Sequence, residues 1–135
     1  MAKKAHKATA PLFLSTEEIL KIHIIQIEAF GGIHGIRDLG LLESATAMPQ
    51  AQFQRKFLHS SLAAMASAYM YHIIKNHPFL DGNKRTGMAA GLVFLHANEC
   101  PLTWSNADVC LIGCAIATSS ITKEEIAARI ETSWS

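Results

Sequence analysis

Apolar residues recur at helical spacing along most of the chain, whereas no stretch shows the alternation that is typical of a half-buried strand. The first stretch shows the helical pattern clearly. Ile19, Ile22 and Ile25 form one apolar stripe, and Ser15 with Glu18 makes a capping box in front of it. The pattern therefore predicts an all-α protein whose first helix begins after Ser15.

Capping residues, glycines and prolines divide the remaining pattern into further helices. Gly31-Gly32 ends the first helix, Asp38 can cap the second, and Pro101 blocks extension of the fourth. Six helices are expected, at about residues 16–30, 39–47, 60–76, 83–98, 106–118 and 123–132. The third is rich in Ala and Met and apolar on most faces, which predicts a central, buried position.

Two connections carry further expectations. Residues 33–37 are expected to form a short extended flap, and Phe53 and Phe57 to pin the polar span 50–59 to the core. The connections between the predicted helices are mostly short, as expected for a compact helical domain. The sequence thus predicts a compact single-domain bundle of about six helices, with the loop that begins at His77 clamped between two central helices.

Length and composition favour one domain over residues 12–135, preceded by a flexible basic tail at residues 1–11. The chain has 135 residues, half of them hydrophobic, and a formal net charge of +1. That is enough for one core, and the charge gives no reason to expect direct nucleic-acid binding. Because no apolar run could span a bilayer and no signal peptide is recognisable, we expect a cytoplasmic protein without membrane contact. The three cysteines are expected to be buried free thiols, which suits a reducing compartment.

The segment HPFLDGNKRTG, residues 77–87, gathers the groups that phosphate chemistry needs. His77 can accept the proton of a hydroxyl group as a general base. Asp81 offers the hard oxygen ligands that Mg²⁺ prefers. Phe79 alternates with these polar positions, so we expect it to point into the core and hold His77 and Asp81 in place. His77 and Asp81 are therefore candidate catalytic residues, and Asp81 is the candidate metal ligand.

The second half of the segment is suited to binding anions. Gly82, Asn83 and Lys84 are expected to present backbone N–H groups to a phosphate at the start of a helix, where the helix dipole favours negative charge. The side-chain amide of Asn83 can add a further donor. Lys84 and Arg85 supply positive charge for phosphate oxygens and for the charge that develops during transfer. Arg85 is therefore also a candidate catalytic residue.

A plainer interpretation of the same segment exists. Each residue taken alone is common in a helix–loop–helix connection with a Gly-Asn turn and solvated cations. The joint arrangement of a histidine, a carboxylate, a turn and two cations within nine residues favours function.

The segment also resembles the signature of the Fic/Doc superfamily, His-x-Phe-x-(Asp/Glu/Asn)-(Gly/Ala)-Asn-(Gly/Lys)-Arg. A second segment, GGIHGIRDLGLLESA at residues 31–45, is similar to the early region of the Doc (death-on-curing) branch. The two segments have the order and separation expected of that branch. The resemblance runs from about Leu12 to about Ile130, nearly the whole chain.

Two positions separate the branches of this superfamily. Fic enzymes that transfer an adenylyl group typically continue Gly-Asn-Gly-Arg-x-x-Arg. Here Lys84 stands in place of the last glycine and Met88 in place of the second arginine, and methionine cannot bind a phosphate. Both departures match Doc-type proteins.

This resemblance implies a kinase-like toxin that transfers the γ-phosphoryl group of ATP, with Mg²⁺, to a Ser or Thr hydroxyl of elongation factor Tu and so inhibits translation. It also implies a Phd-type antitoxin as partner. Some superfamily members carry an inhibitory helix, (Ser/Thr)-x-x-x-Glu-(Gly/Asn). The nearest string here, Ser120–Glu125, fails at its last position, so inhibition by a separate chain is expected. An adenylyltransferase and a catalytically silent binding module of the same fold remain the alternatives.

Other residues are weaker candidates. The resemblance places His34 and Arg37 near the edge that docks the target, although Arg37 is equally suited to pairing with Asp38 or Glu43. His72 is more typical of a satisfied core histidine than of a second catalytic residue.

Overall fold

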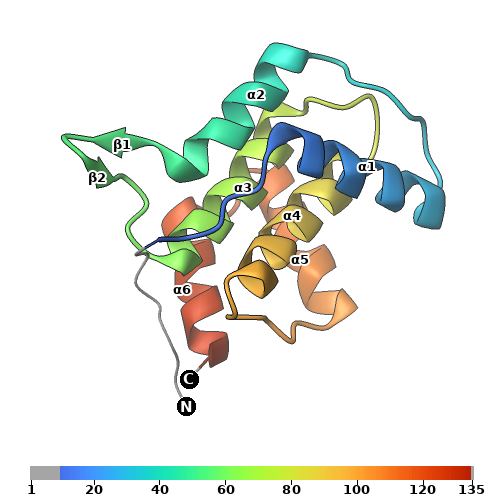
Figure 1. The fold of residues 1–135 in the computed structure, drawn as a ribbon. Coiled ribbons are helices and arrows are strands. Elements are labelled where there is room, and N and C mark those ends of the chain that lie inside the picture. The colour runs from blue at the N-terminus through green and yellow to red at the C-terminus, as the bar shows by residue number, and fades with distance from the viewer. Residues whose placement is uncertain (1–9, 135) are drawn as a thin grey trace.

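The computed structural model describes residues 10–134, and within them the chain folds into a helical bundle (Figure 1). The all-α prediction is confirmed, and residues 77–82, the motif loop, join two central helices. The helices are α1 Thr16–Phe30, α2 Leu39–Ala47, α3 Leu62–Asn76, α4 Asn83–Ala97, α5 Asn106–Ala117 and α6 Lys123–Trp134, with a short 3₁₀ turn η1 at Met48–Gln50. The central helix α3 contacts α2, α4, α5 and α6, while α1 packs on α4.

Local capping explains most helix starts. Ser15 and Ser105 each form a capping box with a carboxylate three residues later, and Asp38 accepts the N–H of Leu41. The start of α3 differs by two residues from the prediction. Its N-cap is Ser61, whose hydroxyl accepts the N–H of Ala64, so the helix begins at Leu62 rather than Ser60.

Glycines let the two central helices approach closely. A Cβ placed on Gly87 would lie 2.8 Å from Cγ1 of Ile74, and one placed on Gly91 would lie 3.1 Å from the backbone oxygen of Ala66. Both contacts are too short for a side chain to be added without movement. The close packing of α3 on α4 fixes the ends between which the motif loop runs.

The segment before α1 is tied to the bundle by hydrogen bonds. The Leu12 N–H donates to Oδ1 of Asn98, and the Asn98 amide donates back to the Leu12 carbonyl, at 2.8 and 3.0 Å. The Leu14 N–H donates to the hydroxyl of buried Tyr69 at 2.8 Å, and burial raises the pKa of that hydroxyl to about 12. Residues 1–9 of the predicted flexible tail lie outside the described residues.

A small hairpin corrects the prediction of a chain without strands. β1 Gln52–Phe53 and β2 Lys56–Phe57 pair antiparallel around Gln54 and Arg55, which both have positive φ (51° and 66°). Two-residue hairpin turns with positive φ favour Asn and Gly. Positions 54 and 55 hold neither residue, so the sequence carries no signal for this turn. The expected anchoring by Phe53 is wrong, because this side chain is 65% exposed. Phe57 does pack, with its ring 5.7 Å from that of Phe13.

In the described part of the chain no helix is long and apolar enough to cross a membrane.

A cluster of three titratable groups joins α3, α6 and the segment after the hairpin. The ammonium group of Lys123 lies 2.9 Å from Nε2 of His72 and 3.1 Å from Nε2 of His59. Because an ammonium group only donates, both ring nitrogens must accept, and both rings are held neutral. Burial and the nearby Lys123 charge lower the pKa of His72 to about 4 from 6.5, and they lower the pKa of His59 as well.

This cluster predicts that stability falls in mild acid. Between pH 6.5 and about 4 the unfolded chain protonates His72 while the folded chain does not, so the free energy of unfolding decreases as pH falls through that window. Because the ring is partly exposed, we expect His72 to account for only about 1 kcal/mol between pH 7.5 and pH 5. Urea unfolding at both pH values should show a smaller loss for His72→Gln than for the native chain. An equal loss in both would contradict the prediction.

Candidate active site

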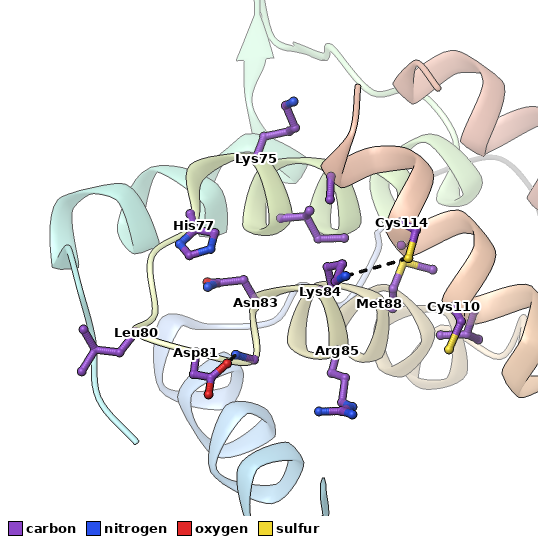
Figure 2. A pocket seen from close by; sticks show the side chains of 15 residues that line it. Lys75, His77, Leu80, Asp81, Asn83, Lys84, Arg85, Met88, Cys110 and Cys114 are labelled. Carbon is purple, nitrogen blue, oxygen red and sulfur yellow. Dashed lines mark hydrogen bonds between the residues drawn. The ribbon is translucent and has the colours of Figure 1, made fainter. Parts of the chain in front are cut away.

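A pocket of about 550 Å³ opens beside the motif loop, between the end of α3, the start of α4 and one face of α5 (Figure 2). Figure 2 shows His77 and Asp81 at one end, on either side of Asn83, and Cys110 and Cys114 toward the other. The structure thus brings six of the predicted site residues around one cavity. These are His77, Asp81, Gly82, Asn83, Lys84 and Arg85.

His77 ends α3 in a left-handed conformation, with φ 53° and ψ 54°. Its N–H still donates to the Ile73 carbonyl, while its exposed imidazole lines the pocket. The chain leaves the helix here because Pro78 follows, and proline disfavours helical geometry in the residue before it. The left-handed conformation of His77 therefore places its imidazole on the pocket side of the helix end.

Arg37 stabilises the end of α3, where the chain turns at His77. Its Nε donates to the His77 carbonyl at 2.7 Å, and its Nη2 donates to the Asn76 carbonyl at 2.9 Å. Both carbonyls are at the end of α3, where helix carbonyls lack internal partners. The suggested pairing of Arg37 with Asp38 or Glu43 is therefore wrong, since the guanidinium binds backbone oxygens. Its role in target docking stays a prediction.

The predicted flap runs beside the motif loop. Ile36 and Phe79 form an antiparallel bridge, and the Leu80 N–H donates to the Gly35 carbonyl at 3.0 Å. Gly35 has a φ of 131°, and a Cβ there would lie 2.8 Å from the side chain of Leu80. Glycine is required at this point both for its backbone conformation and for the close approach. His34 of the flap lies on the surface, where its Nε2 contacts Oε2 of Glu28 at 2.8 Å, and its docking role stays a prediction.

Phe79 and Asn83 hold the loop to the core. The Phe79 ring is fully buried, and its backbone N–H and carbonyl both bond to the side chain of Asn83, at 2.9 and 3.0 Å. The Asn83 side chain is only 5% exposed. One N–H of this amide is used within the loop, so the side chain closes the loop onto the start of α4. Its further use as a phosphate donor stays a prediction.

Asp81 is fixed by two backbone amides. Oδ2 accepts the Ile33 N–H at 3.1 Å, and Oδ1 accepts the Gly82 N–H at 2.9 Å. Each carboxylate oxygen keeps acceptor capacity beyond these bonds. Within residues 10–134 no group of three or more His, Cys, Asp or Glu could hold a metal ion together. This donor set fits Mg²⁺, which is commonly bound by one or two carboxylates and completed by phosphate and water, rather than a metal held in a protein cage.

The start of α4 is suited to an anion. Gly82 is the N-cap in a left-handed conformation, and the amides of Asn83, Lys84 and Arg85 have no hydrogen-bond acceptor among the described residues. Such amides and the helix dipole favour negative charge. The Gly82 amide differs from the prediction, since it donates to Asp81 in this structure.

The two cations of the motif point in different directions. Lys84 extends toward α5, where its Nζ lies 3.8 Å from Sγ of Cys114. The Arg85 guanidinium lies over the ring of Phe30 at the end of α1, 4.6 Å from its centroid. The two charged groups thus lie toward different neighbouring helices, Lys84 toward α5 and Arg85 toward α1.

His23, on α1, is a site residue that the sequence reasoning missed. Its ring is 3% exposed and stacks on the Phe79 ring, with centroids 3.9 Å apart and planes 5° apart. Its Nε2 lies 2.8 Å from the Asp81 carbonyl oxygen, so Nε2 must carry the hydrogen. The one signal in the sequence was a histidine among the apolar residues of the first helix. His23 therefore contacts both Phe79, which anchors the loop, and the backbone of Asp81.

We expect His23→Phe to lower the free energy of unfolding by about 1–3 kcal/mol, because the ring stack is kept while the Asp81 carbonyl loses its donor. Urea unfolding followed by circular dichroism measures this. His96→Phe is the matched control, since His96 is an exposed helix residue, and it should change stability by no more than about 0.5 kcal/mol. Equal stability of His23→Phe and the native chain would show that the bond contributes nothing.

Comparison with known proteins gives consistent matches. The sequence model of the Fic/DOC family matches residues 13–95, from before α1 to near the end of α4. The chain is 41% identical over 86 residues to Toxin Doc of Mycolicibacterium smegmatis, which covers 64% of each protein. It is 31% identical over 85 residues to Protein kinase doc of Escherichia phage P1, covering 63% of this chain and 67% of that one. The chain thus matches just under two thirds of the length of the first of these relatives.

Proposed function

The chain belongs to the Fic/DOC family, and from this we propose that it is a Doc-type toxin that transfers the γ-phosphoryl group of ATP to a Ser or Thr hydroxyl of a protein. The observation that carries the proposal is the pocket, which gathers a histidine, a carboxylate, three unpaired amides and two cations around one cavity. The relative named a protein kinase supports transfer of a phosphoryl group.

In this proposal the residues divide the work by position. His77, exposed at the pocket edge, accepts the proton of the target hydroxyl. The amides of Asn83 and Lys84 hold phosphate oxygens at the start of α4, and Lys84 and Arg85 balance the negative charge from either side. Asp81, preset by its two amide bonds, would hold Mg²⁺ and position it against the phosphates. Bound Mg²⁺ would supply further neutralisation of phosphate charge.

Met88 favours phosphoryl over adenylyl transfer. Its side chain lines the pocket one turn into α4 and is almost fully buried. An adenylyltransferase of this superfamily is expected to have a phosphate-binding arginine at this position. The thioether offers no donor, so phosphates would be held only at the start of α4.

The biological setting follows from the same family. We propose elongation factor Tu as the protein target and a Phd-type antitoxin, a separate chain, as the inhibitor, in the cytoplasm. One relative is named Toxin Doc, and this name supports the pairing with an antitoxin. The string Ser120–Glu125, which matches the inhibitory helix only in part, lies at the start of α6. There Thr122 and Glu125 form reciprocal capping bonds.

The test is intact-mass spectrometry of purified elongation factor Tu after incubation with the chain, ATP and Mg²⁺. A gain of one phosphoryl group supports the proposal, whereas a gain of one adenylyl group replaces it with AMP transfer. If the mass stays unchanged, a cell lysate with γ-labelled and α-labelled ATP separates another target from a silent module. Absence of protein labelling from both nucleotides would overturn the proposal of an enzyme.

A further inference from the structure

Two thiols lie on the pocket wall of α5. Cys110 and Cys114 are both exposed, in contrast to buried Cys100, so the expectation of three buried thiols is wrong for these two. They are four residues apart on one face of the helix, and both line the same pocket as His77 and Asp81. Figure 2 shows them at the end of the pocket beyond Lys84 and Met88.

Cys114 is joined directly to the motif. The ammonium group of Lys84 lies 3.8 Å from Sγ of Cys114, within the range of a hydrogen bond to sulfur. A cation in this position stabilises negative charge that develops on sulfur when the thiol reacts. Lys84 is also one of the two cations next to the free amides of α4. A group attached to Cys114 would therefore crowd the ammonium group of Lys84, which the proposed function assigns to phosphate binding.

The position of the thiols is fixed by helix packing. Gly113 lets α5 approach α4 closely, since a Cβ there would lie 3.3 Å from Cγ of Met88 and 4.0 Å from Cβ of Lys84. The pocket between them holds about 550 Å³. A substituent on Cys114 is thus held against the cavity by a packed helix and is not carried on a loose loop.

We propose that Cys114 is a thiol-modification site that closes this pocket, with Cys110 as a second, more distant acceptor. The reaction is exchange with a low-molecular-weight disulfide. The Cys114 thiolate attacks one sulfur of the disulfide, a new S–S bond forms as the old one breaks, and the leaving thiolate takes up a proton. No net oxidation of the system is required. The attached group occupies the part of the pocket beside Cys114 and keeps the Lys84 ammonium group from a phosphate bound at the first turn of α4.

The blocking effect rests on the proposed function, because it assumes that the pocket binds ATP. The modification itself rests only on the exposure and position of the thiols. The two parts can therefore be measured separately on the same full-length protein, the first by nucleotide binding and the second by mass.

The experiment exposes the full chain to oxidised glutathione and follows the three cysteines by intact mass and peptide mapping. We expect Cys114 to react at least about tenfold faster than Cys100, which is 6% exposed. ATP with Mg²⁺ at about ten times its dissociation constant should slow the reaction of Cys114 about tenfold. Modification should abolish ATP binding measured by calorimetry, and dithiothreitol should restore it.

Serine variants assign the effect to one thiol. In Cys114→Ser, ATP binding should be the same before and after oxidised glutathione, whereas Cys110→Ser should remain sensitive. A Cys114 that reacts no faster than Cys100, or a modified Cys114 that leaves ATP binding intact, would overturn the proposal. If the unmodified chain binds no ATP, the proposed function fails, and the relative rates alone then decide whether Cys114 is a modification site.

Discussion

Replacing His77 by asparagine is expected to lower the rate of phosphoryl transfer by about 10²–10⁴-fold, the usual contribution of a general base. The imidazole is exposed at the pocket edge, while the backbone of His77 is what the fold uses, through its N–H to Ile73 and its carbonyl to Arg37. Asparagine keeps those backbone bonds and removes only the base.

Asparagine is a better replacement than alanine because of the backbone conformation of His77. The residue has a φ of 53°, where alanine is strained by about 1 kcal/mol and asparagine is more readily accommodated. The stability of His77→Asn, measured by urea unfolding, should therefore stay within about 0.5 kcal/mol of the native chain. Transfer measured by mass gain of the target gives the rate. A His77→Asn chain that transfers at the native rate would remove His77 from the mechanism.

Phe79→Ala is expected to have the largest effect on stability, a loss of about 3–5 kcal/mol in the free energy of unfolding. The ring is fully buried and stacks on His23, so its removal leaves a cavity beneath the motif loop. A loss of this size is a large part of the total stability of a typical domain, about 5–15 kcal/mol. Where the variant still folds, phosphoryl transfer should fall as well, because Asp81 and the Asn83 clamp lose their support.

The neighbouring residue provides the matched control. The Leu80 side chain is 52% exposed, and the residue is tied to Gly35 through its backbone N–H. Leu80→Ala should therefore change stability by no more than about 0.5 kcal/mol. Phe79→Leu, which keeps much of the volume, should lie between the two. Equal losses for Phe79→Ala and Leu80→Ala in urea unfolding would contradict the anchoring role.

The helices were predictable because their signals are local. The stripe of Ile19, Ile22 and Ile25 and the boxes at Ser15 and Ser105 involve residues within a few positions of one another, and the structure has a helix at each. Not every stripe residue is covered, since Ile25 is 61% exposed. Periodicity therefore predicts a helix more surely than it predicts the burial of each member.

The sequence by itself determined the helical bundle, its capping residues and the order of the chemical groups from His77 to Arg85, because each depends on neighbours along the chain. Only the tertiary structure placed His23 under Asp81, Arg37 on the end of α3, and Cys114 beside Lys84. These partners are 58, 40 and 30 residues apart. These contacts depend on how closely the helices pack. Glycines such as Gly87 and Gly113 allow close packing because they leave room for a residue of another helix, and such a residue is not a neighbour in the sequence.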